Sequence, residues 1–132
     1  MDVRIEKRKD GSYVAYSKDL ENFAVFGTGD TVTEAKEDFF NTLNEIKEVL
    51  EEDGQEIPSE LMEMPEFHFD ISSLFEFYDV INVSAFARLI GINASLMRQY
   101  KRGDTYISDI QLNKIEEGIH KVGKELCDLK LV

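Results

Sequence analysis

The stretch that most constrains the fold of this chain runs from Val80 to Gly103. It contains no acidic residue, although the 132-residue chain has 27 Asp and Glu against 15 Lys and Arg. Its apolar spacing predicts two short helices that are joined at residues 91–93 (Gly-Ile-Asn). Such a pair is typical of a helix-turn-helix, in which the second helix enters the major groove of DNA. The basic residues of the stretch are Arg88, Arg98, Lys101 and Arg102.

The charge of the chain is divided unevenly. Residues 1–72 contain 7 Lys and Arg and 19 Asp and Glu, whereas residues 73–132 contain 8 of each. An acidic first part would repel DNA and attract a basic partner, and the second part could approach DNA through its basic surface. The alternative is that the acidic residues only keep the protein soluble.

Other features of the sequence limit the class of protein. Cys127 is the only cysteine, so no internal disulfide can form and a cytoplasmic location is expected. No apolar run could span a membrane, and the N-terminal residues lack the apolar stretch of a signal peptide. One cysteine and two well-separated histidines, His68 and His120, make a zinc site unexpected, and no metal or cofactor is predicted.

The first 72 residues are predicted to form an α+β domain. Alternating apolar residues predict a strand over 2–8, and Asp10-Gly11 predicts a hairpin turn before a return strand over 12–17. Further strands are expected over 22–27 and 67–71.

A long helix is expected between the third and fourth strands. Thr31-Val32-Thr33-Glu34 fits a capping box with Thr31 as the N-cap, and Gly54 is a plausible end. The helical spacing places one apolar face against a sheet. That face consists of Val32, Ala35, Phe39, Leu43, Ile46 and Leu50.

Residues 73–132 are predicted to be all helical. A capping box at Ser73–Glu76 opens a short helix, a second helix covers 84–90, and a third covers 94–102 between an Asn93 cap and Gly103. A last helix begins after Ser108 and carries apolar residues at heptad-like spacing. This seam either forms a dimer interface or packs within its own domain, and it consists of Leu112, Ile115, Ile119, Val122 and Leu126.

The third of these helices carries most of the predicted DNA contacts. Met97 and Tyr100 should face inward, which leaves the opposite side for DNA. The amide of Gln99 can donate and accept at an adenine edge. The alternative is a small helical bundle with an incidental basic surface. The predicted base contacts are Ala94, Ser95, Arg98 and Gln99, and the predicted phosphate contacts are Arg88, Lys101 and Arg102.

Several motifs give residues 73–126 a recognisable pattern. They are Phe-Ala-Arg-Leu-Ile-Gly at 86–91, the Asn93 cap, the inward Met97 and Tyr100, and Lys-Arg-Gly at 101–103. Together they resemble the Cro/repressor-type helix-turn-helix domain. The resemblance implies base contacts from the first, second and sixth residues of the recognition helix, which here are Ala94, Ser95 and Gln99. The sequence departs from the family at Val83, near the place of a phosphate-contacting residue such as glutamine.

The first part of the chain carries three further motifs, at residues 10–16 (DGSYVAY), 18–22 (KDLEN) and 26–35 (FGTGDTVTEA). Together they resemble the HicB antitoxin family, with Lys18 in place of the proline of its Pro-Asp-Leu step. The resemblance implies a degenerate ribonuclease-H-like fold without a catalytic role, built from a three-to-four-stranded sheet and one long helix. It also implies a partner, a small basic RNA-cleaving toxin of the HicA type.

These inferences predict an antitoxin with a toxin-binding domain at 1–72 and a DNA-binding domain at 73–132. It would bind double-stranded operator DNA as a homodimer or higher oligomer and repress its own operon, because symmetric operators require paired recognition helices. Some acidic side chains of the long helix would face the toxin, although a solvated helix surface is an equal alternative. These candidates are Glu37, Asp38, Glu45 and Glu48.

Two other functions remain possible from the sequence. One is a stand-alone transcriptional regulator, whose HicB-like domain serves dimerisation or sensing and has no toxin. The other is a residual nuclease, in which Asp10, Asp19 and Asp70 would gather around metal ions. Catalysis is not expected, because a turn position explains Asp10 and no nucleophile–base arrangement is suggested.

Overall fold

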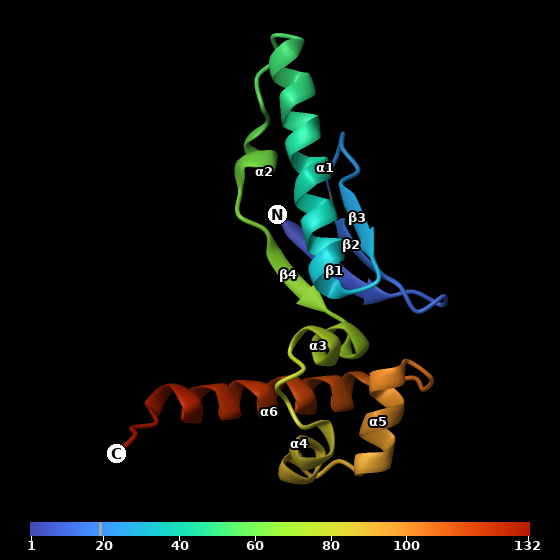
Figure 1. Cartoon of the computed structure of the whole chain (residues 1–132), viewed down its shortest axis with the longest axis vertical. Helices are drawn as coiled ribbons and strands as arrows, with labels where there is room; N and C mark the ends of the chain where they lie inside the picture. The colour runs from blue at the N-terminus through green and yellow to red at the C-terminus, as the bar shows by residue number, and fades with distance from the viewer. Residues whose placement is uncertain (19) are drawn as a thin grey trace. The chain divides into compact units, whose positions relative to one another are not determined.

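The computed structural model of the chain describes residues 1–18 and 20–132. These residues form two compact units, Met1–Val80 and Ile81–Val132 (Figure 1). The elements are β1 (Asp2–Lys7), β2 (Tyr13–Ser17), β3 (Phe26–Gly29), α1 (Val32–Glu52), α2 (Ser59–Met62), β4 (Glu66–Phe69), α3 (Ile71–Phe77), α4 (Val83–Ile90), α5 (Ala94–Arg102) and α6 (Asp109–Asp128).

The first unit is a four-stranded mixed sheet packed on α1, with strand order β3-β2-β1-β4. β1 pairs antiparallel with β2, and β2 pairs antiparallel with β3, so the three strands form a meander. β4 returns parallel to β1 after the long crossover that contains α1, as a parallel connection requires. Figure 1 shows α1 lying along the sheet.

The structure confirms the apolar face that the helical spacing predicted for α1. Val32, Ala35, Phe39, Leu43 and Leu50 are buried, and Ile46 packs against the same core. Thr31 caps the helix, since its side chain accepts a hydrogen bond from the Glu34 N–H at 3.1 Å. The Glu34 carboxylate accepts a hydrogen bond from the N–H of Asp30 at 2.7 Å. The helix ends at Glu52, and Gly54 follows with a φ of 69°.

β3 packs against α1 at a distance that only glycine permits. A Cβ added to Gly27 would lie 2.1 Å from the backbone N of Phe39 and 2.5 Å from the carbonyl O of Ala35. Both atoms belong to the α1 backbone, so they cannot rotate away as a side chain can. The two glycines of the Phe-Gly-Thr-Gly motif therefore serve packing, and they lie in β3 rather than in a turn.

Three sequence predictions in the first unit are wrong. The fourth strand ends at Phe69 instead of residue 71, because Asp70 caps α3 and Ile71 already belongs to that helix. The third strand covers Phe26–Gly29 instead of 22–27, because residues 26–29 are the ones that pair with Tyr16–Tyr13 of β2. The capping box at Ser73 does not form. Asp70 caps α3 instead, accepting from the Ser73 N–H at 2.8 Å, and Ser73 itself is buried.

α3 belongs to the first unit, whereas the sequence placed it with the helix-turn-helix. The Glu76 carboxylate of α3 accepts a hydrogen bond from the Val32 N–H at the start of α1, at 3.0 Å. Phe77 packs against the core of the sheet and stacks on Phe69 with ring centroids 5.8 Å apart. The compact units divide between Val80 and Ile81, eight residues beyond the boundary expected at 72/73.

The second unit is helical, with a core built from α4, α5 and the first half of α6. Its predicted elements are confirmed at the caps: Asn93 begins α5, Gly103 ends it, and the Ser108 side chain accepts from the Gln111 N–H at 3.2 Å. α4 begins at Val83 with Asn82 as its cap. Leu89 of this helix is 66% exposed.

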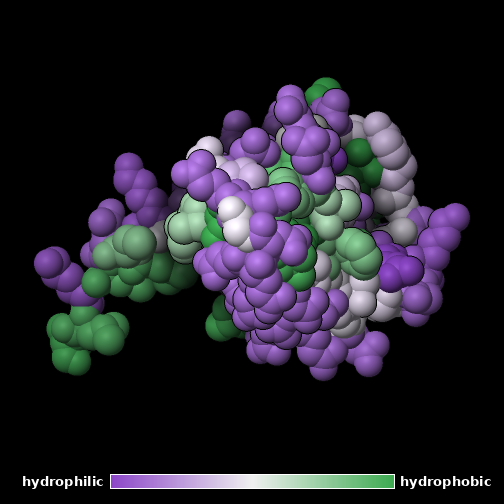
Figure 2. All heavy atoms as spheres, turned by 90° about the horizontal axis from the view of Figure 1, so that it is seen from above, coloured by the Kyte–Doolittle hydropathy of each residue, from purple (hydrophilic) through white to green (hydrophobic). Residues whose placement is uncertain are grey.

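The apolar seam of α6 is divided along its length. Ile115 and Gly118 are buried in the second unit, whereas Leu126 is 61% exposed and Leu129 beyond the helix is 63% exposed. Figure 2 shows apolar surface at the C-terminal end of the chain, at the far left of the view. Of the seam residues, Ile115 is buried within its own unit, Ile119 and Val122 are half-buried, and Leu112 is 39% exposed. The exposed end at Leu126 is the part that a dimer interface could use.

The two glycines of α6 make a matched test of this packing. A Cβ at Gly118 would lie 2.4 Å from Cγ2 of Ile90, whereas a Cβ at Gly123 meets nothing within 4 Å. We expect Gly118→Ala to destabilise the second unit by about 1–3 kcal/mol, because the stiff β-branched Ile90 must move. Gly123→Ala should stabilise it by up to about 1 kcal/mol through helix propensity. Urea denaturation of both variants measures the difference, and equal stabilities would contradict the described packing.

Within the described residues, none of the helices has the length and apolar character needed to cross a bilayer. Cys127, near the end of α6, is an exposed free thiol.

Candidate nucleic-acid interface

α4 and α5 are joined by the three residues 91–93, as the sequence predicted. α4 ends at Gly91, whose φ of 76° lies in the left-handed region that favours glycine. Lys114 of α6 donates to the Gly91 carbonyl at 3.2 Å. Ile92 is buried, and Asn93 then caps α5 by accepting from the Leu96 N–H at 3.1 Å. Three residues thus connect α4 to α5, and the middle one, Ile92, is buried in the core.

α5 buries one side and exposes the other. Met97 and Tyr100 are buried in the core of the second unit, as their spacing predicted, and Phe86, Ala87 and Ile115 are buried there too. Val83, at the start of α4, is buried as well, so it cannot reach a phosphate. The side of α5 away from the core is the candidate DNA surface.

The structure places the four predicted base contacts in different environments. Ser95 is exposed and Ala94 is half-buried. Arg98 is exposed, and its Nη1 donates to Oγ of Ser84 on α4 at 2.8 Å. This hydrogen bond joins the outer sides of α4 and α5, so it holds the guanidinium near the start of α4.

Gln99 has a partner that the sequence did not indicate. Its Oε1 accepts a hydrogen bond from the Thr105 hydroxyl, in the loop after α5, at 3.1 Å. The side-chain NH₂ group is left to donate. Thr105 thus occupies one of the two acceptor positions of the Gln99 oxygen and orients the amide, so that its NH₂ group can donate to a base edge.

The predicted phosphate contacts also differ from one another. Arg88 and Lys101 are exposed. The Arg102 Nε donates to the Asp104 carboxylate at 2.8 Å, so this guanidinium is already neutralised in part. Residues 81–132 contain 8 Lys and Arg and 6 Asp and Glu, a net charge of +2. The second unit thus presents positive charge, which DNA attracts.

The first unit has the opposite charge. Residues 1–80 contain 7 Lys and Arg and 21 Asp and Glu, a net charge of −14. All four toxin-contact candidates on α1 are exposed: Glu37, Asp38, Glu45 and Glu48. Asp38 has a structural partner, because its carboxylate accepts from the Thr28 N–H of β3 at 2.8 Å.

The face of the sheet opposite α1 is a second candidate surface, which sequence patterning alone did not identify. Val3 and Ile5 of β1 are buried towards α1, so the alternate residues of each strand point to the other side. The strand register aligns one side chain from each strand in a row. In strand order the row is Phe26, Tyr16, Arg4 and His68.

Acidic side chains surround this row. The Tyr16 hydroxyl donates to the Glu6 carboxylate at 3.1 Å, and partial burial together with this carboxylate raises the pKa of Tyr16. His68 Nε2 lies 3.8 Å from an Asp2 oxygen and 3.6 Å from a Glu66 oxygen. The side chains of Asp2, Glu66 and His68 are all exposed. Among the described residues they form the one group whose ligand atoms lie close enough together to hold a metal ion.

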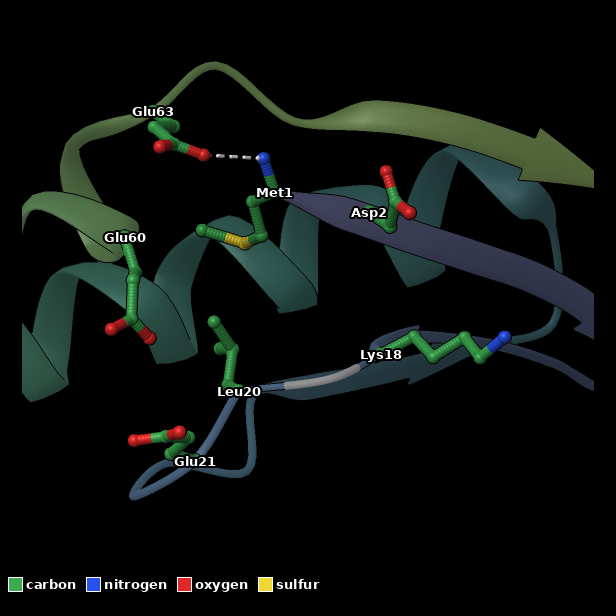
Figure 3. A pocket seen from close by; sticks show the side chains of 7 residues that line it. All are labelled: Met1, Asp2, Lys18, Leu20, Glu21, Glu60 and Glu63. Carbon is green, nitrogen blue, oxygen red and sulfur yellow. Dashed lines mark hydrogen bonds and ion pairs between the residues drawn. The ribbon is translucent and has the colours of Figure 1, made fainter.

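A pocket of about 400 Å³ adjoins this acidic group and shares Asp2 with it. Figure 3 shows the Leu20 side chain pointing towards Met1, with the carboxylates of Glu21 and Glu60 on the same side of the pocket. The Met1 amine is paired with Glu63 at 3.0 Å. Lys18 also lines the pocket, which is otherwise dominated by acidic side chains.

Two of the three carboxylates proposed for a residual nuclease, Asp10 and Asp70, have structural partners. Asp10 accepts from the Ser12 hydroxyl at 2.6 Å and from the Ser12 N–H at 2.9 Å, and these hydrogen bonds lower the pKa of Asp10. Asp70 caps α3 and also accepts from the Lys7 N–H at 2.9 Å. Asp19 lies outside the described residues. The hairpin and the cap thus account for Asp10 and Asp70 without a metal.

Comparisons with protein-family models, with curated proteins and with solved structures found no match to this chain.

Proposed function

We propose that this protein is the antitoxin of a HicA/HicB-type pair, which neutralises a small basic RNA-cleaving toxin and represses its own operon. The observation that carries the proposal is the pairing of a helix-turn-helix of net charge +2 with an α/β unit of net charge −14. The two units suit opposite partners: DNA for one and a basic protein for the other. The protein acts in the reducing cytoplasm, where an exposed Cys127 thiol is stable.

The finer description of the fold is part of this proposal. A meander of three strands, a long crossover helix and a fourth strand parallel to the first are what a ribonuclease-H-like domain of the HicB type needs. The Phe-Gly-Thr-Gly-Asp-Thr motif supports the same assignment, because Gly27 and Thr31 hold β3 and the start of α1 together. On this assignment the sheet is a binding scaffold rather than a catalytic one.

A capture experiment separates the antitoxin from the stand-alone regulator. The tagged full-length chain is recovered from its native cells, and the proteins that accompany it are identified by mass. We expect a small basic protein that is released at high salt, that arrests growth when expressed alone, and that is harmless when this chain is expressed with it. If cells that express the chain yield no such protein, the stand-alone regulator is correct and the antitoxin function is wrong.

Gln99→Ala tests the proposed base contact. This variant should bind the operator about 5- to 150-fold more weakly, the equivalent of about 1–3 kcal/mol, and should lose sequence preference at one base pair. Thr105→Val should change which base is preferred at that position, because it frees the amide oxygen of Gln99, whereas Thr105→Ser retains the hydroxyl. Selection from randomised operator DNA measures both effects, and unchanged preferences in all three variants would exclude Gln99 from the readout.

A further inference from the structure

The row of side chains on the open sheet face has the composition of a binding surface. Phe26 is 56% exposed and pairs with Tyr16 at the start of the edge strand β3. Tyr16 lies opposite Arg4, so an exposed phenylalanine, a half-buried tyrosine and an arginine are adjacent across three strands. Aromatic residues and arginine are the types that dominate the energetic centres of protein interfaces.

The rim of this row is acidic. Glu6 lies beside Tyr16 and accepts its hydroxyl proton in a hydrogen bond, and Asp2 and Glu66 face each other across the β1–β4 pairing. The adjoining pocket adds the carboxylates of Glu21 and Glu60 (Figure 3). The surface therefore combines aromatic rings with carboxylates, and a positively charged partner complements it.

The chemistry favours arginine and lysine side chains as the groups that bind here. A guanidinium stacks on an aromatic ring and pairs with a carboxylate through two parallel hydrogen bonds. Phe26, Tyr16 and Glu6 offer both halves of that arrangement within one face. A nucleic acid is disfavoured, because six carboxylates along the face and pocket would repel its phosphates.

We propose that the basic toxin docks on the open face of the sheet, centred on Phe26 and Tyr16, and inserts a basic side chain into the adjoining acidic pocket. This proposal rests on the antitoxin function and assigns it a surface. The exposed side of α1, with Glu37, Glu45 and Glu48, is then a solvated helix surface rather than the toxin site.

Photo-crosslinking in the full chain tests the location directly. The crosslinking residue p-benzoylphenylalanine replaces Phe26 in one variant and Glu45 on α1 in the other, and both are expressed in the native cells. We expect the Phe26 variant to give an adduct with the same small basic protein that the tagged chain captures, and the Glu45 variant to give none. The adduct is identified by its mass after denaturation.

Glu→Gln variants, which remove a charge from each proposed surface, test the docking site through the affinity for the toxin. Glu6→Gln with Glu66→Gln should weaken binding of the captured toxin about tenfold or more, since each removes a charged acceptor but keeps the shape of the side chain. Glu45→Gln with Glu48→Gln, the matched pair on α1, should leave the affinity within about twofold. Urea denaturation of both pairs should match that of the unmodified protein, which shows that the first unit is folded.

Each other outcome overturns the docking site. A toxin adduct at Glu45 but not at Phe26 moves the site to α1 and leaves the antitoxin function standing. A Phe26 adduct with a second copy of this chain assigns the face to self-association, and one with nucleic acid assigns it to RNA or DNA. If the tagged chain captures a toxin but Phe26 gives no adduct with it, the location alone is wrong. If no toxin is captured, the proposed function fails and the docking site fails with it.

Discussion

Gly27→Ala should prevent the first unit from folding stably. The added Cβ would overlap the backbone N of Phe39 and the carbonyl O of Ala35, so β3 would have to move away from α1 or the helix would have to bend. We expect a loss of about 3 kcal/mol or more, a large part of the roughly 4–12 kcal/mol that stabilises a unit of this size. Far-UV circular dichroism during urea denaturation follows the transition of the full chain.

A second glycine of the same unit is the control. Gly11 has a φ of 88° in the β1–β2 hairpin, and a Cβ there meets nothing within 4 Å. Gly11→Asn should cost less than about 1 kcal/mol, because asparagine tolerates the left-handed conformation. A Gly27→Ala protein as stable as the Gly11→Asn protein would contradict the close packing of β3 on α1.

The double variant Arg88→Gln, Lys101→Gln should lose most of the phosphate-dependent affinity. In a plot of the logarithm of the DNA association constant against the logarithm of the salt concentration, each phosphate contact contributes about 0.9 to the slope. Removal of two contacts should therefore weaken DNA binding on the order of 60-fold at about 0.1 M salt. The slope itself should become less steep by roughly 2. The loss should be the same for operator and for unrelated DNA, since phosphates carry no sequence information.

Lys124→Gln on α6 is the matched control, because Lys124 is an exposed lysine of the same unit outside α4 and α5. It should leave affinity and salt slope unchanged. Fluorescence anisotropy of labelled DNA at several salt concentrations measures all of these values. A double variant with the salt slope of the unmodified protein would show that Arg88 and Lys101 do not contact phosphates.

The elements that the sequence predicted well are those with local signals. α1 and α5 begin at Thr31 and Asn93 because each side chain accepts an N–H of the first turn, an interaction that needs no tertiary partner. The left-handed Gly103 likewise marks the end of α5. These positions were correct from the sequence because the physics that sets them acts over four residues.

The errors occurred where tertiary structure chooses between local alternatives. Residues 22–29 contain several apolar residues in succession, and only pairing with β2 decides that the strand is Phe26–Gly29. Ser73 and Asp70 are both acceptable caps, and burial of Ser73 in the first unit leaves the cap to Asp70. In the second case packing of α3 on the sheet overrides a capping box.

In the candidate sites, too, features set by local sequence were predictable and features set by tertiary structure were not. The position of α5 and the inward direction of Met97 were predictable from helical spacing. The hydrogen bond between Thr105 and Gln99 was not, because it depends on the path of the loop after α5. The row of Phe26, Tyr16 and Arg4 depends on the register of three strands, which hydrophobic alternation does not specify across a sheet.

The most direct test of the central claim is the binding of the purified full-length protein to the DNA upstream of its own gene, titrated against salt and against unrelated DNA. The account predicts a site bound about 1,000-fold or more tightly than unrelated DNA, with affinity that falls steeply as salt rises. Equal affinity for both DNAs, or no binding at 50 mM salt, would contradict a sequence-specific repressor and leave the helical unit without its proposed role.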